Sequence, residues 1–257
     1  MRERSDSHMV DLWGLTDEGM VRAQLQDACA FQQKEGYAWA VVCDGMGGAA
    51  AGDLASTMAR DRYESHMACL ADPALYAQEE DLMIQAVRAA NRAVYLKAGT
   101  SRAYAGMGTT LVGALVKGKE LFVINVGDSR AYRITGNAIR RITRDHSVVE
   151  ELIQHGALTP EEARRHPQRN LITRALGTTK QVQADLFRET VEEGDAILLC
   201  SDGLVNEVTD QEMLEEVLAG GTAAEVCHRH YFMPSFYESQ RTPQPPRQSL
   251  PGVRSAR

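Results

Sequence analysis

The sequence contains no long apolar run. None of its apolar stretches approaches the roughly 20 consecutive residues that a membrane-spanning helix needs. The first residues also lack the basic stretch followed by an apolar core that is typical of a secretory signal. We therefore expect a cytoplasmic protein that does not associate with a membrane.

Cysteine is scarce, and positive charge is not in excess. The five cysteines have no paired spacing typical of a metal site, and two of them lie inside apolar runs, so we expect reduced core residues. The formal net charge of −7 argues against a nucleic-acid-binding protein. With 257 residues, 44% hydrophobic and 25% charged, the chain suits one large soluble domain, which we expect to be a monomer.

Charge and proline are unevenly distributed along the chain. Residues 227–257 contain five Arg, one Glu and five of the eight prolines. That segment therefore carries +4, which leaves −11 for the first 226 residues out of the total of −7. We expect a flexible N-terminus over residues 1–10, one folded domain over 11–226, and a disordered basic tail over 227–257.

Three apolar runs each deliver an aspartate next to a glycine. The runs over 38–43, 121–126 and 196–201 are followed by Asp44, Asp128 and Asp202. Buried strands that end in this way can bring carboxylates together around Mg²⁺ or Mn²⁺, which prefer hard oxygen ligands. The alternative is that each Asp-Gly pair is only a hairpin turn, but none has alternating strands on both sides at hairpin spacing.

Eight short motifs, in order along the chain, give a resemblance to a known family. The sequence resembles the bacterial metal-dependent protein phosphatases of type 2C, also called the PPM family. The resemblance covers roughly residues 11–226. The matching segments are 16–22 (TDEGMVR), 26–27 (QD), 44–48 (DGMGG), 106–111 (GMGTTL), 126–132 (VGDSRAY), 143–147 (TRDHS), 171–177 (LITRALG) and 199–204 (LCSDGL).

The order of the expected elements indicates an α+β fold. Two helical stretches, over 52–70 and 78–97, precede a series of strand pairs, which favours a layered sandwich. The resemblance implies a four-layer α/β/β/α arrangement of two antiparallel sheets flanked by helices. We expect its last strand to be missing, because the segment that should supply it is rich in proline. The expected strands lie at 109–116, 121–126, 131–134, 138–142, 185–191 and 196–201, and short helices at 148–155, 159–162 and 209–218.

The resemblance also implies a role for each candidate site residue. Arg22 holds the substrate phosphate, for which the planar guanidinium fork is suited. Asp44 bridges two metal ions, and the Gly45 carbonyl binds one of them. Asp202 binds the other ion, and Asp128 with Asp202 can form a weaker third site, so two or three Mn²⁺ or Mg²⁺ ions are expected. Asp27 supports the metal site through water.

The end of the chain departs from the family pattern. The family's remaining direct ligand is the Asp of a Gly-Gly-x-Asp-Asn turn, and no Asp follows Asp210 in this sequence. One hypothesis is a serine/threonine phosphatase, active or weakened, that uses a metal-activated water on phosphorylated protein substrates of a Ser/Thr kinase. The other is a non-catalytic phosphoprotein-binding remnant. A cysteine-phosphatase mechanism is rejected, because Cys43 and Cys200 should point into the core.

Overall fold

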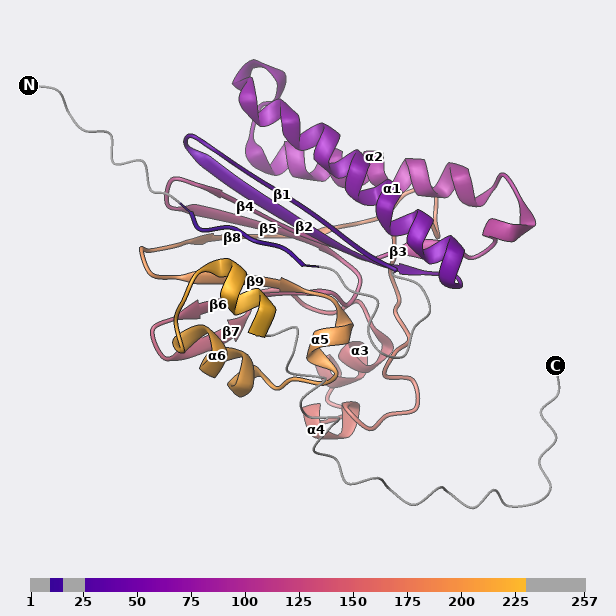
Figure 1. Cartoon of the computed structure of the whole chain (residues 1–257). Coiled ribbons are helices and arrows are strands. Elements are labelled where there is room, and N and C mark those ends of the chain that lie inside the picture. Colours follow the sequence, from indigo (N-terminus) through magenta and orange to yellow (C-terminus); the bar gives the residue numbers. More distant parts are fainter. Residues whose placement is uncertain (1–9, 16–25, 230–257) are drawn as a thin grey trace, which may run out of the picture.

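The strands form two antiparallel sheets that pack face to face between layers of helices (Figure 1). The computed structural model describes residues 10–15 and 26–229. The larger sheet has the strand order β1-β2-β4-β5-β8, with the short β3 paired to the end of β2. Its strands are β1 (Asp27–Lys34), β2 (Tyr37–Met46), β3 (Gly108–Thr109), β4 (Leu111–Lys117), β5 (Glu120–Val126) and β8 (Asp185–Thr190).

The central strands of this sheet are apolar on both faces because both faces are covered. On β4, Leu111 and Leu115 pack toward the helices, while Val112 and Ala114 pack toward the second sheet. Successive side chains of a strand point to opposite faces, so a strand buried on both sides reads as a continuous apolar run. This explains why the runs over 109–116 and 121–126 show no alternation of polar and apolar residues.

The smaller sheet has the order β7-β6-β9 and lies against the larger one (Figure 1). Its strands are β6 (Arg130–Thr135), β7 (Ala138–Arg141) and β9 (Ala196–Cys200). Between the two sheets, Ala131 and Ile142 pack with Val112 and Val123 of the larger sheet. Strand β9 is an edge strand, since it pairs with no second strand in the described part of the chain.

Helices cover the outer face of each sheet (Figure 1). The long helices α1 and α2 pack on the larger sheet, where their apolar side chains join one extensive core. On the smaller sheet a much smaller core contains Tyr132, Cys200, Val208 and Met213. The helices are α1 (Ala49–Met67), α2 (Glu79–Ala98), α3 (Val148–Gln154), α4 (Pro160–Ala163), α5 (Asp202–Val205) and α6 (Asp210–Leu218), with 3-10 turns at Ala68–Ala71, Pro73–Leu75 and Arg102–Tyr104.

The predicted fold class is confirmed: the protein is an α+β sandwich of two antiparallel sheets flanked by helices. Two local expectations need correction. The apolar residues over 12–15 favour a short strand, but this segment is not in a sheet. The strand that carries Asp44 does not stop before it but continues to Met46, because its end pairs with β3. Within the described residues, a further helical stretch covers residues 223–229. Residues 230–257, which include the expected site of the missing strand, lie outside the described residues.

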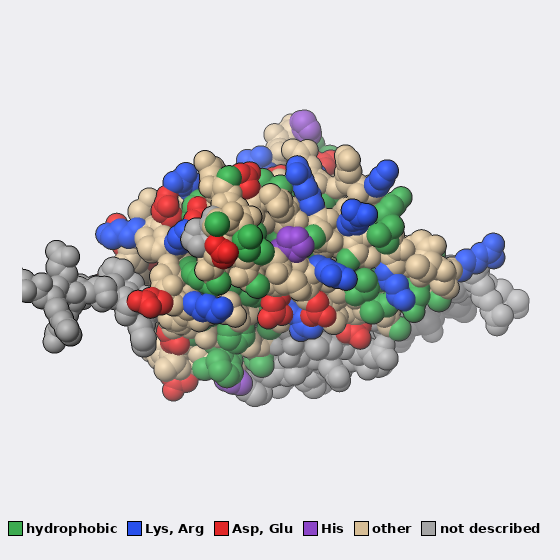
Figure 2. All heavy atoms as spheres, turned by 90° about the horizontal axis from the view of Figure 1, so that it is seen from above, with side chains coloured by type: hydrophobic (Ala, Val, Ile, Leu, Met, Phe, Trp, Pro, Cys, Tyr) green, Lys and Arg blue, Asp and Glu red, His purple; other side chains and the backbone are tan. Residues whose placement is uncertain are grey.

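The surface over α1 and α2 mixes charges of both signs. Figure 2 shows both acidic and basic side chains on this face, with the basic ones more numerous on the right of the view. Within residues 10–15 and 26–229, no helix is both long enough and apolar enough to cross a membrane.

Candidate metal centre

The end of β2 holds Asp44 in a fixed backbone position. Two adjacent threonines of the 106–111 motif supply the contacts. The amide of Asp44 donates to Thr110 Oγ1 at 2.9 Å, and the Asp44 carbonyl accepts from Thr110 N at 2.8 Å and from Thr109 Oγ1 at 2.9 Å. Across the β1–β2 pair, Asp27 lies directly opposite Asp44. The two carboxylates therefore enter the site side by side from neighbouring strands.

The glycine after Asp44 allows helix α1 to begin against this strand. A Cβ atom on Gly45 would lie only 2.0 Å from the carbonyl oxygen of Gly52, a backbone atom of the helix. Gly45 N also donates to Gln26 O at 2.9 Å. Only a residue without a side chain fits this crossing of two backbones. The glycine-rich turn thus places the start of α1 beside the carboxylate.

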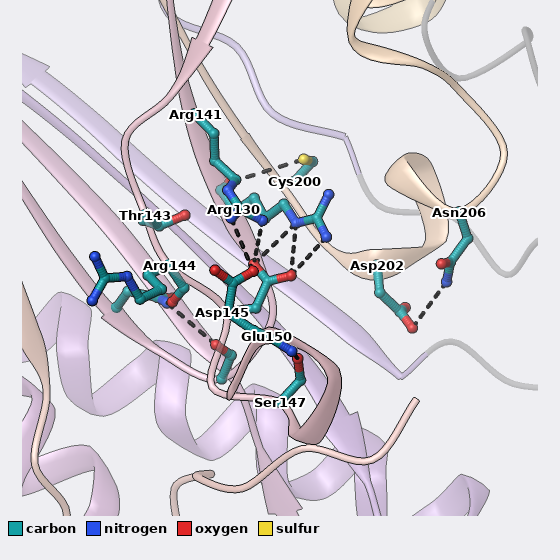
Figure 3. A network of polar contacts seen from close by, with 12 residues as sticks. Arg130, Arg141, Thr143, Arg144, Asp145, Ser147, Glu150, Cys200, Asp202 and Asn206 are labelled. Carbon is teal, nitrogen blue, oxygen red and sulfur yellow. Dashed lines mark hydrogen bonds and ion pairs between the residues drawn. The ribbon is translucent and has the colours of Figure 1, made fainter. Parts of the chain in front are cut away.

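Asp202 reaches the same region from the smaller sheet. It is the first residue of α5, directly after β9. Its Oδ2 accepts a hydrogen bond from Asn206 Nδ2 at 3.2 Å (Figure 3). The preceding residue, Ser201, donates from its hydroxyl to Asp27 Oδ2 at 2.8 Å. This contact joins residues 174 positions apart in the sequence and connects the two sheets at the site.

The electrostatics show that these carboxylates crowd one another. The pKa of Asp44 is raised well above its usual range, first by burial and then by the negative charges of Asp27 and Asp202, with which it also shares hydrogen bonds. Burial, followed by the charges of Asp202 and Asp145, raises the pKa of Asp128 to about 7. Without a counter-charge, therefore, this group of aspartates does not ionise fully at neutral pH.

A divalent cation fits this donor set. Among the described residues, no three His, Cys, Asp or Glu side chains already form a closed metal cage. The carboxylates instead meet in pairs, Asp44 with Asp27 and Asp44 with Asp202. Mg²⁺ typically uses one or two carboxylates and keeps several waters, and Mn²⁺ prefers the same oxygen donors. A cation here would also neutralise the repulsion that raises the pKa of Asp44.

A second polar network borders the site and carries no excess charge of its own. Arg130 forks onto Asp145, with Nη2 at 2.6 Å and Nε at 3.0 Å from Oδ2 (Figure 3). Arg141 approaches the other oxygen of Asp145 at 3.4 Å and binds Glu150 at 3.0 Å. Because Asp145 is only 7% exposed, these guanidinium groups are needed to compensate its charge. The network attaches the start of the segment 145–174 to the smaller sheet.

The structure brings four of the predicted site residues into electrostatic contact and leaves one untested. Asp27, Asp44, Asp128 and Asp202 interact through their charges. Gly45 lies beside them at the end of β2. Arg22 falls in 16–25, outside the described residues. Sequence reasoning missed the contributions of Ser201, Arg130 and Asp145, although each lies within a quoted motif and next to or near a predicted ligand.

The cysteines are where a structural role would put them. Cys43 is 0% exposed and Cys200 is 6% exposed. Burial raises the pKa of the Cys43 thiol far above its ordinary value and that of Cys200 to about 12. A thiol is a poor nucleophile unless it ionises, so these side chains are inert core residues.

Comparison with known proteins agrees with this geometry. The sequence model of the family Protein phosphatase 2C matches residues 21–243. The serine/threonine phosphatase stp of Listeria monocytogenes is 38% identical over 209 residues, which cover 79% of this chain and 81% of that protein. The crystal structure of serine/threonine phosphatase Stp1 from Staphylococcus aureus shares 37% identity, with a TM-score of 0.79 over 88% of this chain and 89% of that one.

A further solved structure contains metal. The catalytic domain of the serine/threonine protein phosphatase PstP, in complex with two manganese ions, is 34% identical, with a TM-score of 0.72 over 86% of this chain and 89% of that one. The sequence-based assignment is therefore confirmed. This chain belongs to the protein phosphatase 2C family of serine/threonine phosphatases.

Proposed function

We propose that this protein removes phosphate from phosphoserine and phosphothreonine in proteins, with Mn²⁺ or Mg²⁺ bound at the aspartates around Asp44. The observation that carries the proposal is that Asp44, which is half-buried, meets Asp27 on one side and Asp202 on the other through hydrogen bonds and charge repulsion. Strongly perturbed pKa values cluster at functional sites, and a bound cation would reverse the effect of this repulsion on the pKa. The named relatives are phosphatases, which favours the enzyme over the non-catalytic alternative.

Each candidate residue has a distinct part in this proposal. Asp44 and Asp202 would hold metal from the two sheets, and Asp128 would contribute from the turn after β5. The Gly45 carbonyl would add a neutral oxygen, and Asp27 would act from one step further out, through water. Arg22 would bind the phosphate of the substrate with its guanidinium fork. We propose two or three ions in all.

The chemistry follows from what these residues can and cannot do. When bound, Mn²⁺ or Mg²⁺ supplies a Lewis acid that lowers the pKa of water and neutralises charge on phosphoryl oxygens. The protein's own side chains would hold the metal ions and orient the substrate phosphate. Because burial raises the pKa values of the Cys43 and Cys200 thiols, neither of these two side chains competes with water as a nucleophile. Water attack without a covalent enzyme intermediate is the route that this set of residues supports.

The proposal extends to substrates and setting. Phosphorylated proteins made by a Ser/Thr kinase would be the substrates, since a phosphatase needs a kinase to supply them. We propose that the enzyme works as a monomer in the cytoplasm, without nucleic acid or membrane as a partner. The folded domain would begin near residue 11, with residues 1–10 outside it. The basic tail is proposed to lie outside the catalytic core.

Hydrolysis is expected to depend completely on a divalent cation. Turnover of p-nitrophenyl phosphate and of a phosphothreonine peptide should disappear on chelation and return when Mn²⁺ or Mg²⁺ is added, because the proposed ligands are hard carboxylate oxygens. Cys43→Ala is the matched control and should keep the metal dependence, since the thiol is buried and protonated. Hydrolysis that survives complete chelation would remove the basis of the proposal.

The altered end of the chain is expected to weaken metal binding. A variant whose residues after 229 are replaced by an ending with the family's Gly-Gly-x-Asp-Asn turn gains one carboxylate. Its half-saturating Mn²⁺ concentration should fall by roughly tenfold or more, because ligand charge strongly tunes the affinity for hard cations. The same ending with Asn in place of its Asp is the control. Equal half-saturation in all three proteins would mean that other residues, such as Asp128, already complete the site.

A further inference from the structure

His146 is a buried histidine at the start of the segment 145–174, next to the proposed metal centre. Its side chain is 6% exposed. Its ring lies between two parts of the fold: the turn Gly127–Asp128 after β5, and the pair formed by Arg174 and Asp185. No role has been given to it so far. The inference below rests on the proposed function, because it concerns how Asp128 is held.

His146 forms hydrogen bonds with both the carbonyl and the amide of Gly127. The amide of His146 donates to the Gly127 carbonyl at 2.9 Å, and the Gly127 amide donates to His146 Nδ1 at 3.0 Å. Gly127 has a φ of +112°, and a Cβ there would lie 2.6 Å from Thr110 Cγ2, so only glycine fits. Asn125 Nδ2 also donates to the Gly127 carbonyl, at 3.2 Å. The residue directly before Asp128 is therefore fixed by its two neighbours.

The hydrogen bond from Gly127 determines the tautomer of the ring. A backbone N–H can only donate, so His146 Nδ1 must present a lone pair, and the ring proton must be on Nε2. Nε2 lies 3.3 Å from Asp185 Oδ2, which can accept that proton's hydrogen bond. Arg174 Nη1 lies 3.2 Å from Nε2, but a guanidinium cannot accept, so its bond goes to Asp185 Oδ1 at 3.0 Å. Asp185 thus selects the tautomer that binds Gly127.

On the other side of Asp128, Ser129 contacts Thr110, which lies between β3 and β4. Ser129 Oγ lies 2.7 Å from Thr110 Oγ1, and that same oxygen accepts from the Asp44 amide at 2.9 Å. Ser129 is 0% exposed, so this chain of bonds is shielded from water. Asp128 therefore sits between two anchors: Ser129, connected to Asp44, and Gly127, connected to His146. The spacing between the Asp44 and Asp128 backbones depends on both.

We propose that His146 is a positioning residue for Asp128: as the Nε2–H tautomer set by Asp185, it holds the Gly127 peptide so that the Asp128 carboxylate faces Asp202. Loss of a residue that orients a metal ligand from one step away typically lowers metal affinity or activity by about 10–100-fold. His146 also accepts a hydrogen bond from Thr173 N at its carbonyl, 2.7 Å away. The position of Asp128 is thereby linked to the end of the segment 145–174, which also carries Arg174.

Two substitutions separate the two sides of the ring. The amide of Asn in His146→Asn overlaps the place of Nδ1 and can accept from Gly127, whereas the longer side chain in His146→Gln reaches toward Asp185 and leaves Gly127 without an acceptor. We expect the half-saturating Mn²⁺ concentration to rise by roughly 10-fold or more in His146→Gln, the range for losing such a second-layer contact, and by less than about threefold in His146→Asn. Michaelis constants for p-nitrophenyl phosphate should change little in either.

A measurement on the metal-free wild-type protein tests the same idea without turnover. The nitrogen chemical shifts of the His146 ring, from a ¹⁵N-histidine-labelled sample, should report a neutral Nε2–H tautomer. The Gly127 amide should exchange slowly with solvent, and exchange faster in His146→Gln than in His146→Asn. An Nδ1–H tautomer would overturn the assignment, and so would equal effects of the two substitutions. If the wild-type protein proved inactive while the ring showed the expected tautomer, the proposed function would fail, but the assignment of the two hydrogen bonds between His146 and Gly127 would stand.

Discussion

Replacing Asp44 by asparagine is expected to abolish phosphatase activity. The side chain keeps its size but loses the charge that meets Asp27 and Asp202 at the proposed metal centre. Turnover at saturating Mn²⁺ should fall by at least about 10²–10³-fold, the range for losing one electrostatic stabiliser of a transition state. Wild-type turnover in this variant would show that the central assignment is wrong. Asp61→Asn, which changes only an exposed carboxylate paired with Arg60 on α1, is the matched control and should remain active.

The same substitution is expected to stabilise the metal-free protein. Because the pKa of Asp44 is raised in the folded state, the folded protein retains a proton that the unfolded chain has already released. The free energy of unfolding therefore falls as the pH rises above the ordinary pKa of an aspartate. An asparagine side chain does not ionise, so Asp44→Asn should melt higher than wild type at pH 8, by about 2–4 °C for each kcal/mol of repulsion removed. The gain should vanish below about pH 4, where the aspartate is protonated in both states, and added Mn²⁺ should stabilise only the wild type.

Adding one methyl group at Gly45 is expected to damage both stability and activity. In Gly45→Ala the new Cβ would lie 2.0 Å from Gly52 O and 2.8 Å from Gln26 O, both backbone atoms that cannot rotate away. Forcing a group into such a packed crossing costs about 1–3 kcal/mol or more. The strain would be relieved by moving the end of β2 away from α1, and Asp44 moves with it. Thermal melting and Mn²⁺-dependent turnover should therefore decline together.

The control for this change is Gly99, which caps the C-terminal end of α2. Gly99 has a helical φ of −76°, and a Cβ there would meet the nearest atom at 3.6 Å, an ordinary contact. Gly99→Ala should leave the melting temperature within a few degrees of wild type or slightly above it, because alanine reduces the freedom of the unfolded chain. A Gly45→Ala protein as stable and active as Gly99→Ala would show that the crossing of β2 and α1 tolerates separation.

Much of the fold is predictable because its strands are covered on both faces. A continuous apolar run bounded by glycines indicates such a strand, and the runs before Asp44, Asp128 and Asp202 became β2, β5 and β9. The glycines between 109–116 and 121–126 and between 131–134 and 138–142 also favour hairpin turns, and in the structure Gly118 and Gly136 have the positive φ that two-residue turns require. The long helices followed from apolar residues at helical spacing. Local sequence patterns were therefore sufficient to predict the buried strands, the hairpin turns and the long helices.

The resemblance supplied candidate ligands for the site, but the contacts that support them are long-range and were not predictable. Nothing local in the sequence shows that Ser201 donates to Asp27, or that the His146 ring accepts from Gly127. Such contacts arise when the two sheets dock, and no periodicity encodes the docking. The motif over 143–147 marked the region, yet the compensation of Asp145 by Arg130 needs three-dimensional geometry to be seen. Resemblance supplied the roles, and the structure supplies the contacts.

The unequal size of the two helix-covered cores has a consequence for local opening. The core under α1 and α2 is extensive, whereas the one under α5 and α6 is small and β9 is only half-buried. Regions with few buried apolar contacts open more readily than the rest of a protein. Asp44 lies on the larger sheet, which has the extensive core, and Asp202 lies beside the smaller sheet, which has the small core. A cation bound by both residues would therefore connect the two sheets. Release of the ion would then be coupled to local opening of the smaller sheet and its helices.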